Sequence, residues 1–278
     1  MASDDVYVIT GGTGGMGLAS ARALADRGQL LLLDLVAEEL QAACTELRVG
    51  GARVESLRCD VTSTADVAEV AEKIGAMGSF KALVHTAGVS PLMADGRRVL
   101  DVDLIGSVRI TDAVFPLVGP GTSAVLIGSI AAYAGVGPEV EALLNDPMVD
   151  GFLDAIEGAV DGDLDGSTAY VFAKRGVVKL AERLSSTWGA KGGRAVSIAP
   201  GLIDTPMGRM ELEGQPLIPA MIDATPVKRP EQVLPGRPDD IANAVAFLVS
   251  DQAGFISGCD LRIDGGLIGG VSNAFGTG

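Results

Sequence analysis

Tyr170 and Lys174 place a phenol and an ammonium four residues apart. In a helix this spacing brings both side chains to one face. An ammonium beside a phenol stabilises the phenolate, so we expect Lys174 to lower the pKa of Tyr170 towards neutrality. Tyr170 could then exchange a proton with an alcohol or carbonyl oxygen. Ser129 follows an expected strand over residues 123–128, where its hydroxyl could hydrogen-bond the same substrate oxygen.

A glycine-rich run over residues 10–17 joins an expected strand to an expected helix. Its glycines fit both the spacing G-x-G-x-x-G and the wider spacing G-x-x-x-G-x-G. Without Cβ atoms the backbone can approach a pyrophosphate closely. The start of the helix supplies unpaired N–H donors and the positive end of the helix dipole. The run therefore predicts a dinucleotide-binding turn.

Asp34 ends the second expected strand, 17 residues after Gly17. An acidic side chain near this distance accepts hydrogen bonds from the adenosine ribose hydroxyls of a dinucleotide. A carboxylate there would repel a 2′-phosphate, and the sequence has no Arg or Lys in the glycine-rich run or beside Asp34 to bind one. We therefore expect NAD(H) rather than NADP(H) as the cofactor.

Short runs of Val, Ile and Leu alternate with helical patterns, and this order would position the groups above. Candidate strands cover residues 6–10, 29–33, 53–58, 82–85, 123–128, 194–198 and 260–263. Candidate helices cover residues 18–27, 65–77, 99–118, 169–188 and 239–249. The alternation predicts an α/β fold, a Rossmann-type doubly wound parallel sheet of about seven strands with helices on both faces. No linker or repeat interrupts it, so residues 1–278 are expected to form a single NAD(P)-binding domain.

Taken in order, these motifs resemble the short-chain dehydrogenase/reductase family in its compact, single-domain form. The matching segments are residues 10–17, Asp34, Asp60-Val61, Ala87-Gly88, Ser129, Tyr170 with Lys174, Pro200-Gly201 with Thr205, and Asp264-Gly265-Gly266. The resemblance implies that Tyr170 is the acid/base and that Ser129 positions the substrate oxygen. It also implies that Lys174 binds the nicotinamide ribose and lowers the pKa of Tyr170.

The same resemblance implies a set of cofactor contacts. They are Thr10, Gly11, Thr13, Gly15, Met16, Gly17, Asp34, Asp60, Val61, Ala87, Gly88, Tyr170, Lys174, Pro200, Gly201, Ile203 and Thr205. Asp60 and Val61 would contact the adenine. Ile203 and Thr205 would contact the carboxamide. The hydride chemistry itself would belong to the cofactor.

Two positions depart from the family pattern. His85 begins a His-Thr-Ala-Gly segment where Asn-Asn-Ala-Gly is usual, and Asp103 stands where a helix Asn usually assists the proton relay. Asp103 remains a catalytic candidate, because the family Asn is thought to act by shaping the helix so that its backbone carbonyl binds water. A carboxylate near Lys174 would nevertheless alter the field there. We expect His85, the only histidine, to be packed at a strand end rather than catalytic.

Ser129 and Tyr170 are 41 residues apart, farther than in most compact members of the family. The extra material covers residues 135–166, here called the insertion, and its apolar residues recur at helical spacing. It could form a lid beside the active site, or a helix pair docked on the body that alters an oligomer contact. The insertion loosely resembles that of the 3α-hydroxysteroid dehydrogenase/carbonyl reductase subgroup, which suggests a bulky, steroid-like or alicyclic substrate. Residues 206–235, rich in Pro and Met, are expected to shape the substrate pocket.

The chain carries 21 Lys and Arg against 36 Asp and Glu, a formal net charge of −15, and nine of these acids lie in the insertion, which has no Lys or Arg. This balance disfavours nucleic acids and anionic membrane surfaces as partners. The three cysteines lie far apart and suit neither a disulfide framework nor a metal site, so no metal is expected. No secretory signal pattern opens the sequence, which favours the cytoplasm. The family resemblance implies a homo-oligomer, a dimer or a tetramer.

These observations predict an NAD(H)-dependent oxidoreductase that interconverts a hydrophobic secondary alcohol and its ketone. One alternative is a protein of the same fold that binds the dinucleotide as a sensor or scaffold without turnover, since a fold does not fix a function. An epimerase or dehydratase that uses the cofactor internally is a further alternative. It would ordinarily need a larger C-terminal substrate domain than this chain offers after Ile203.

Overall fold

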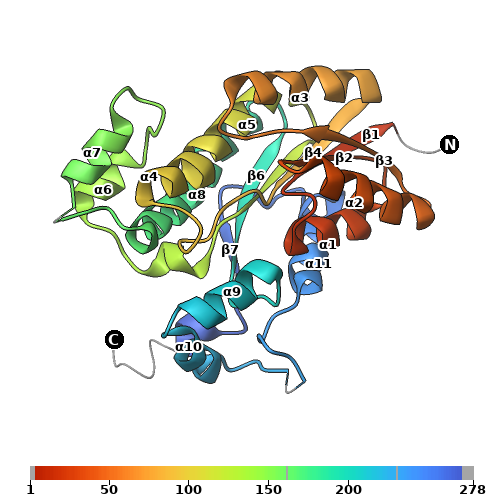
Figure 1. The fold of residues 1–278 in the computed structure, drawn as a ribbon. Coiled ribbons are helices and arrows are strands. Elements are labelled where there is room, and N and C mark those ends of the chain that lie inside the picture. The colour runs from red at the N-terminus through yellow and green to blue at the C-terminus, as the bar shows by residue number, and fades with distance from the viewer. Residues whose placement is uncertain (1–3, 161, 230, 271–278) are drawn as a thin grey trace.

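The strands of this chain form one parallel sheet in the order β3-β2-β1-β4-β5-β6-β7 (Figure 1). The computed structural model describes residues 4–160, 162–229 and 231–270. The strands are β1 (Asp5–Thr10), β2 (Gln29–Asp34), β3 (Arg53–Arg58), β4 (Ser79–His85), β5 (Ser123–Ile127), β6 (Arg194–Pro200) and β7 (Asp260–Ile263). The predicted α/β fold is confirmed, with each strand within about three residues of its expected bounds. Asp161 and the parts of the predicted domain that fall on residues 1–3, 230 and 271–278 lie outside the described residues.

The strand order reverses between β1 and β4, because the chain first builds outward to β3 and then crosses back. In open parallel sheets this switch point is where ligands bind, outside the carboxyl ends of the strands. The glycine-rich turn follows β1, and Asp34 ends the neighbouring β2. Both predicted cofactor elements therefore stand at the switch point.

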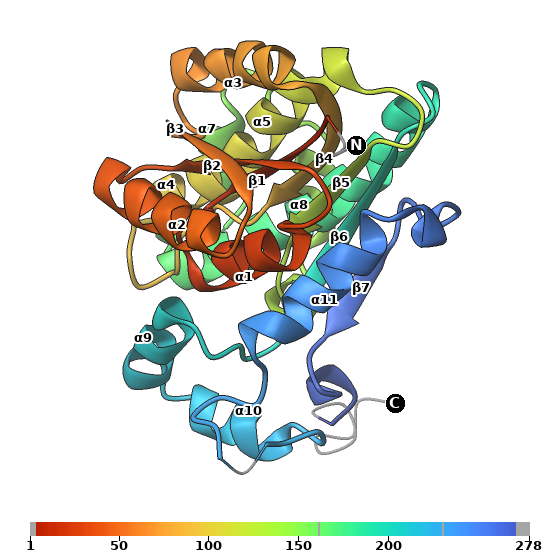
Figure 2. The same cartoon turned by 90° about the vertical axis from the view of Figure 1, so that its right-hand side faces the viewer.

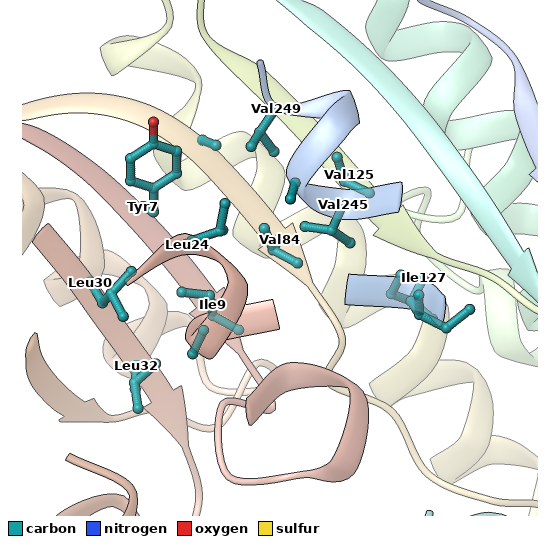
Figure 3. Packing of buried hydrophobic residues seen from close by; sticks show 14 of the residues in the cluster. Tyr7, Ile9, Leu24, Leu30, Leu32, Val84, Val125, Ile127, Val245 and Val249 are labelled. Carbon is teal, nitrogen blue, oxygen red and sulfur yellow. The ribbon is translucent and has the colours of Figure 1, made fainter. Parts of the chain in front are cut away.

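Helices cover both faces of the sheet. They are α1 (Gly15–Leu24), α2 (Ala37–Val49), α3 (Thr64–Met77), α4 (Gly96–Leu100), α5 (Gly106–Val114), α6 (Pro138–Leu143), α7 (Phe152–Gly158), α8 (Gly166–Gly189), α9 (Pro206–Gly214), α10 (Ile218–Ala224) and α11 (Pro238–Leu248). Residues of α1, α2 and α11 pack on one face of the sheet, and residues of α3, α5 and α8 on the other. Figure 3 shows the first of these layers, where Leu24 and Val245 meet Ile9 and Val84 of the sheet.

Three helical predictions need correction. Helix α1 begins at Gly15 rather than residue 18, because Gly14 takes an extended conformation and caps the helix at that point. Helix α2 was not among the expected helices, although Leu40, Ala43, Cys44 and Leu47 are buried at helical spacing. That spacing is the signal that could have found it.

The third correction concerns the helix expected over residues 99–118. The structure divides it into α4, a π-helical turn η1 (Asp101–Ile105), α5 and a 3₁₀ turn η2 (Phe115–Leu117). In η1 the amide of Gly106 donates to the carbonyl of Asp101, five residues earlier. A π-turn widens the backbone without breaking the helix, and such turns are frequent at functional sites.

The insertion forms α6 and α7, which lie beside α4 and α8 at one end of the molecule (Figure 1). Val140, Leu144, Phe152 and Ile156 are buried there against residues of α4, η1 and α8. Each such buried side chain stabilises the docked state by about 2 kcal/mol. The insertion therefore has its own apolar contact with the body, as its amphipathic pattern requires.

Helices α9 and α10 follow β6 and stand apart from the helices that cover the sheet (Figure 2). They lie within residues 206–235, where the substrate pocket is predicted. Thr205 caps α9, its hydroxyl accepting a hydrogen bond from the Gly208 amide at 3.0 Å. Across residues 4–160, 162–229 and 231–270, no helix is both long and apolar enough to cross a membrane.

Candidate active site

The turn after β1 packs as closely as its glycines predict. Gly11 has a φ of +61°, and a Cβ on Gly17 would stand 2.1 Å from the Gly11 carbonyl oxygen. A Cβ on Gly15 would stand 2.6 Å from Cγ2 of Thr205. Gly14 caps α1 with no side-chain hydrogen bond, which leaves the first amides of the helix for a ligand. The turn is thus a backbone cradle of the kind that holds a phosphate group.

Asp34 lies beside that cradle at the carboxyl end of β2. Its Oδ2 accepts hydrogen bonds from the Thr13 amide at 3.0 Å and the Thr13 hydroxyl at 2.6 Å. Arg58 stands opposite Asp34 in the register of β2 and β3, but its guanidinium binds Asp66 instead. Within the described residues no basic side chain is bonded to Asp34. The carboxylate therefore stands in a position where a ribose hydroxyl could replace Thr13 as the donor.

A cavity of about 680 Å³, here called the cofactor cavity, opens at the switch point. It has the size of a small-molecule site. Its lining includes these predicted contacts: Thr10, Gly11, Thr13, Gly15, Met16, Gly17, Asp34, Asp60, Val61, Ala87, Gly88 and Thr205. The predicted contacts Tyr170, Lys174, Pro200, Gly201 and Ile203 are not part of its lining. Ile203 instead lines a neighbouring cavity of about 360 Å³, so its contact with a carboxamide stays a prediction.

Several lining residues of the cofactor cavity were not indicated by the sequence. Met207 and Met210 come from α9, Met93 from the loop after β4, and Arg98 from α4. The two α9 residues fall in the segment predicted to shape the substrate pocket. Met93 and Arg98 carry no spacing that marks them, because the sheet topology alone brings their segments to the cavity.

Arg98 acts on Asp60, one of the predicted adenine contacts. The guanidinium lies 3.6 Å from Asp60, whose Oδ1 also accepts hydrogen bonds from the amide and hydroxyl of Thr62. Burial raises the pKa of Asp60, but the Thr62 hydrogen bonds and Arg98 outweigh it and hold the pKa below its usual range. Asp60 is therefore an anchored carboxylate in the lining of the cavity, where the adenine is predicted to bind.

The structure brings Ser129, Tyr170 and Lys174 together. Ser129 follows β5 and caps the short turn η3 (Ile130–Tyr133), its hydroxyl accepting a hydrogen bond from the Ala131 amide. Tyr170 and Lys174 lie one turn apart on α8, with the ammonium 5.1 Å from the centre of the phenol ring. The Ser129 hydroxyl lies close enough to the Tyr170 phenol to lower the pKa of that phenol. A substrate oxygen at this point could contact both hydroxyls.

Asp103 of η1 is the fourth group of this constellation. Its Oδ2 lies 2.9 Å from the Lys174 ammonium, and both side chains are buried. Its Oδ1 accepts a hydrogen bond from the Val89 amide at 2.8 Å. Burial lowers the pKa of Lys174, but Asp103, together with Tyr170 and Glu211, outweighs burial and raises the pKa overall. Lys174 is therefore a buried cation whose charge is largely balanced by Asp103.

The ion pair corrects the expectation for Tyr170. Lys174 does lower the pKa of the phenol, as its position predicts. The net pKa is nevertheless raised, first because the phenol is buried and further because Glu211 and Asp103 oppose the phenolate. The sequence suggested the effect of one ammonium, whereas the structure adds two carboxylates near it.

His85 is packed at the end of β4, as expected. Its Nδ1 lies 2.8 Å from the Thr10 hydroxyl and its Nε2 2.9 Å from the Ser107 hydroxyl. Ser107 in turn donates to the backbone carbonyl of Asp103 at 2.6 Å. Burial lowers the pKa of His85 to about 3, so the ring is neutral and holds η1 in place through Ser107.

Known proteins match this chain along nearly all of its length. A family model described as short chain dehydrogenase matches residues 5–139, and one described as Enoyl-(Acyl carrier protein) reductase matches residues 157–268. Cis-4-hydroxycyclohexanecarboxylate dehydrogenase of Sinomonas cyclohexanicum is 34% identical, over 95% of this chain and 96% of its own. The chain belongs to the short-chain dehydrogenase/reductase family.

Other family members agree with this assignment. D-threitol dehydrogenase of Mycolicibacterium smegmatis is 31% identical, over 94% of this chain and 92% of its own. A solved short-chain type dehydrogenase/reductase from Mycobacterium ulcerans has a TM-score of 0.77 at 26% identity, over 96% of this chain and 90% of that one. Between them the two family models leave residues 140–156 unmatched, inside the insertion.

As a short-chain dehydrogenase/reductase, the chain is an oxidoreductase that acts on CH–OH groups, and the family implies an NAD(P)(H) cofactor. The residues present fit such a dinucleotide. The glycine cradle would hold its pyrophosphate, Asp34 its adenosine ribose, and Asp60 with Val61 would border its adenine. Among the described residues no group of His, Cys, Asp and Glu side chains could hold a metal ion.

Proposed function

We propose that this chain is an NAD(H)-dependent oxidoreductase that interconverts a hydrophobic, alicyclic or steroid-like secondary alcohol and its ketone. The observation that carries this proposal is that Ser129, Tyr170 and the buried Lys174 lie together, while Asp103, the ion-pair partner of Lys174, stands against Gly88 of the cofactor cavity. The first three side chains are the groups that alcohol oxidation needs, namely a proton acceptor, a hydrogen-bond donor for the oxygen and a cation that stabilises the phenolate.

Ser129, Tyr170 and Lys174 have different roles in the proposed reaction. In the oxidising direction the Tyr170 phenolate accepts the hydroxyl proton of the alcohol, while the Ser129 hydroxyl hydrogen-bonds the same oxygen. A bound nicotinamide dinucleotide would take up the hydride from the carbinol carbon. In the reducing direction the Tyr170 hydroxyl returns the proton to the ketone oxygen. Lys174 stabilises the phenolate by its charge, and the family resemblance implies that it also binds the nicotinamide ribose.

Two observations support a hydrophobic ring as the substrate. Met93, Met207 and Met210 line the cavity, and their apolar, adaptable side chains suit a bulky aliphatic ring. The relative from Sinomonas cyclohexanicum is named for a hydroxylated cyclohexane ring. From this name we propose only a cyclohexane-like ring for the substrate of the present chain, and the substrate carboxylate is considered separately below.

The uncompensated charge of Asp34 supports NAD(H) as the cofactor. A 2′-phosphate at this position would meet a carboxylate and no bonded basic side chain. We expect kcat/KM with NAD to exceed that with NADP by at least about tenfold, which corresponds to about 1.4 kcal/mol of repulsion. The variant Asp34→Ala should lower the ratio of kcat/KM with NAD to kcat/KM with NADP.

Initial rates of NADH and NADPH formation, with a panel of cyclohexanols and hydroxysteroids, test both parts of the proposal. Glu38→Ala is the matched control, because Glu38 is an exposed acid of α2 that does not line the cavity. A preference for NADP would refute the role of Asp34. Retained NADH binding without turnover of any alcohol or ketone would favour the sensor or scaffold instead.

A further inference from the structure

Helix α9 forms one wall of the cofactor cavity, through Pro206, Met207 and Met210. Its start is fixed by the Thr205 cap and by the short bridge between Ile203 and Gly236. The helix is therefore held against the cofactor cavity, which the loop that follows β4 also lines. Residues 86–93 of that loop are called the β4 loop below.

Glu211 of α9 is bound to the β4 loop. The hydroxyl of Ser90, which is fully buried, donates to Oε1 of Glu211 at 2.8 Å. One turn further along, a Cβ on Gly214 would stand 2.4 Å from Cδ1 of Leu92, so the helix and the loop are in close contact. The second carboxylate oxygen, Oε2, has no hydrogen-bond partner within the described residues. The buried Ser90 thus orients the Glu211 side chain, and Oε2 of Glu211 remains available as a hydrogen-bond acceptor.

Among the described residues Glu211 has no ion-pair partner of its own. Burial raises its pKa overall, although the charge of Lys174 acts on it and lowers that pKa in part. Lys174 is already paired with Asp103 at 2.9 Å, and the partner of Glu211 is a neutral hydroxyl. Glu211 is still near enough to the catalytic groups to raise the pKa of both Tyr170 and Lys174. Glu211 is not part of the lining of the cofactor cavity, but it lies one turn after Met207 and next to Met210, which are, so it stands at the edge of that cavity near Tyr170.

We propose that Glu211 is a specificity-determining residue that selects neutral alcohols with a second hydroxyl and rejects alcohols that carry a carboxylate. Its Oε2 would accept a hydrogen bond from the second hydroxyl of a diol. A substrate carboxylate in the same place would face an unbalanced negative charge in a partly buried site. This inference rests on the proposed function, because it assigns the substrate class of that same reaction.

Three substrates with one ring separate these effects. They are cyclohexanol, 1,4-cyclohexanediol and 4-hydroxycyclohexanecarboxylate. For the wild-type protein with NAD we expect kcat/KM to be highest for the diol and lowest for the carboxylate. Glu211→Gln should raise kcat/KM for the carboxylate roughly tenfold, since the charge is removed. Glu211→Leu should in addition reduce the preference for the diol over cyclohexanol, since the acceptor is removed.

Glu213→Gln is the matched control, because Glu213 is an exposed acid two residues along the same helix. It should leave all three kcat/KM values unchanged. If Glu211→Gln leaves the ratio between the diol and the carboxylate as it is in the wild type, the inference is overturned. An equal gain in Glu213→Gln would overturn it too, since the effect would then be one of net charge.

Binding of two unreactive ligands keeps this inference distinguishable from the proposed function. Cyclohexanecarboxylate and cyclohexanecarboxamide have the same ring and differ in charge, and their dissociation constants can be measured on the NADH complex by NADH fluorescence. We expect the amide to bind more tightly, and Glu211→Gln to remove roughly tenfold of that difference. If the amide binds more tightly but no alcohol is turned over, the proposed oxidoreductase function is refuted and the role of Glu211 in selectivity is supported. If cyclohexanols are turned over but both ligands bind equally, the proposed function is supported and the role of Glu211 is refuted.

Discussion

Burial of the phenol is the largest cause of the raised pKa of Tyr170, and the ion pair between Asp103 and Lys174 modifies that pKa. Lys174 is the one group of this constellation that stabilises the phenolate by charge, and Asp103 offsets it from a distance of 2.9 Å. The raised pKa of Tyr170 keeps its hydroxyl protonated at neutral pH. A protonated phenol is the form that donates to a ketone, so the site is poised for reduction at neutral pH and needs alkaline pH for oxidation.

The variant Asp103→Asn tests how far the charge of Asp103 raises the pKa of Tyr170. Asparagine keeps the Oδ1 acceptor for the Val89 amide and removes the negative charge beside Lys174. The pKa of Tyr170 should then fall, because the ammonium stabilises the phenolate without opposition. We expect the acid limb of the pH profile of kcat for alcohol oxidation to move to lower pH by about one unit.

Asp101→Asn is the control for this prediction, since Asp101 lies on the same π-turn but pairs with Arg98 and Arg109 at the surface. Its pH profile should match that of the wild-type protein. An Asp103→Asn profile that stays in place or moves to higher pH would show that Asp103 does not set the pKa of Tyr170.

At the residue scale, the sequence predicts a side chain's role when that role depends only on the spacing of residues within one segment. The Tyr170 and Lys174 pair, the glycine cradle and Asp34 were predictable, because each depends on its own segment. The raised pKa of Tyr170 was not, because it depends on carboxylates brought in from η1 and α9. The same holds for Glu211 and Ser90, which meet only through the fold.

At the scale of elements, the insertion is a docked helix pair and contributes no described residue to the lining of the cofactor cavity. Its acids account for much of the net charge, and several of them bind the body. Glu141 pairs with Arg175 and Lys179 of α8, and Asp154 with Glu157 pairs with Arg97 of α4. Of the two predictions for the insertion, the docked arrangement agrees with this geometry. A role in oligomer contacts stays a prediction.

Glu141→Gln should weaken this docking in a pH-dependent way. Hydrogen bonds from Arg175, and then from Lys179, lower the pKa of Glu141 from 4.5 to about 2. A lowered carboxyl pKa gives stability that is present above the unfolded pKa and is lost as pH falls through the folded pKa. Solvent screens this partly exposed pair, so we expect a loss of about 1 kcal/mol in the free energy of unfolding at neutral pH.

Urea unfolding of the wild-type and Glu141→Gln proteins measures this loss. The difference should begin to shrink below about pH 4.5, as the unfolded chain takes up its proton. Glu139→Gln, an exposed position on the same helix, is the matched control and should change little. A difference that stays constant from neutral to acidic pH would mean that the charge of Glu141 does not hold the insertion.

Some helices and strands could be predicted from sequence patterns alone, and others could not. The strands were predictable because buried parallel strands are short apolar runs bounded by turn residues. The break of the expected helix over residues 99–118 was not, because a π-turn has no breaker residue and is held by the Ser107 and His85 contacts. The apolar spacing of the insertion predicted a helix and the need for a partner, but α4 and α8 were identified only by the structure.

At the scale of the molecule, the parallel sheet gathers the catalytic and cofactor groups from segments far apart in the chain. The order β3-β2-β1-β4-β5-β6-β7 places the cradle, Asp34 and the β4 loop at one edge, with Ser129 after β5. Helix α8 then adds Tyr170 and Lys174. This convergence is what the succession of motifs predicted, since the carboxyl ends of parallel strands share an edge.

In the proposed reaction this site oxidises a secondary alcohol with Tyr170 as the proton acceptor and NAD as the hydride acceptor. The most direct test is the rate of NADH formation from a cyclohexanol, measured for the wild-type protein and for Tyr170→Phe, with NADH binding measured in parallel. We predict turnover by the wild type, a loss of at least about a thousandfold in Tyr170→Phe, and similar NADH binding in both. A Tyr170→Phe variant that forms NADH at the wild-type rate would contradict the account.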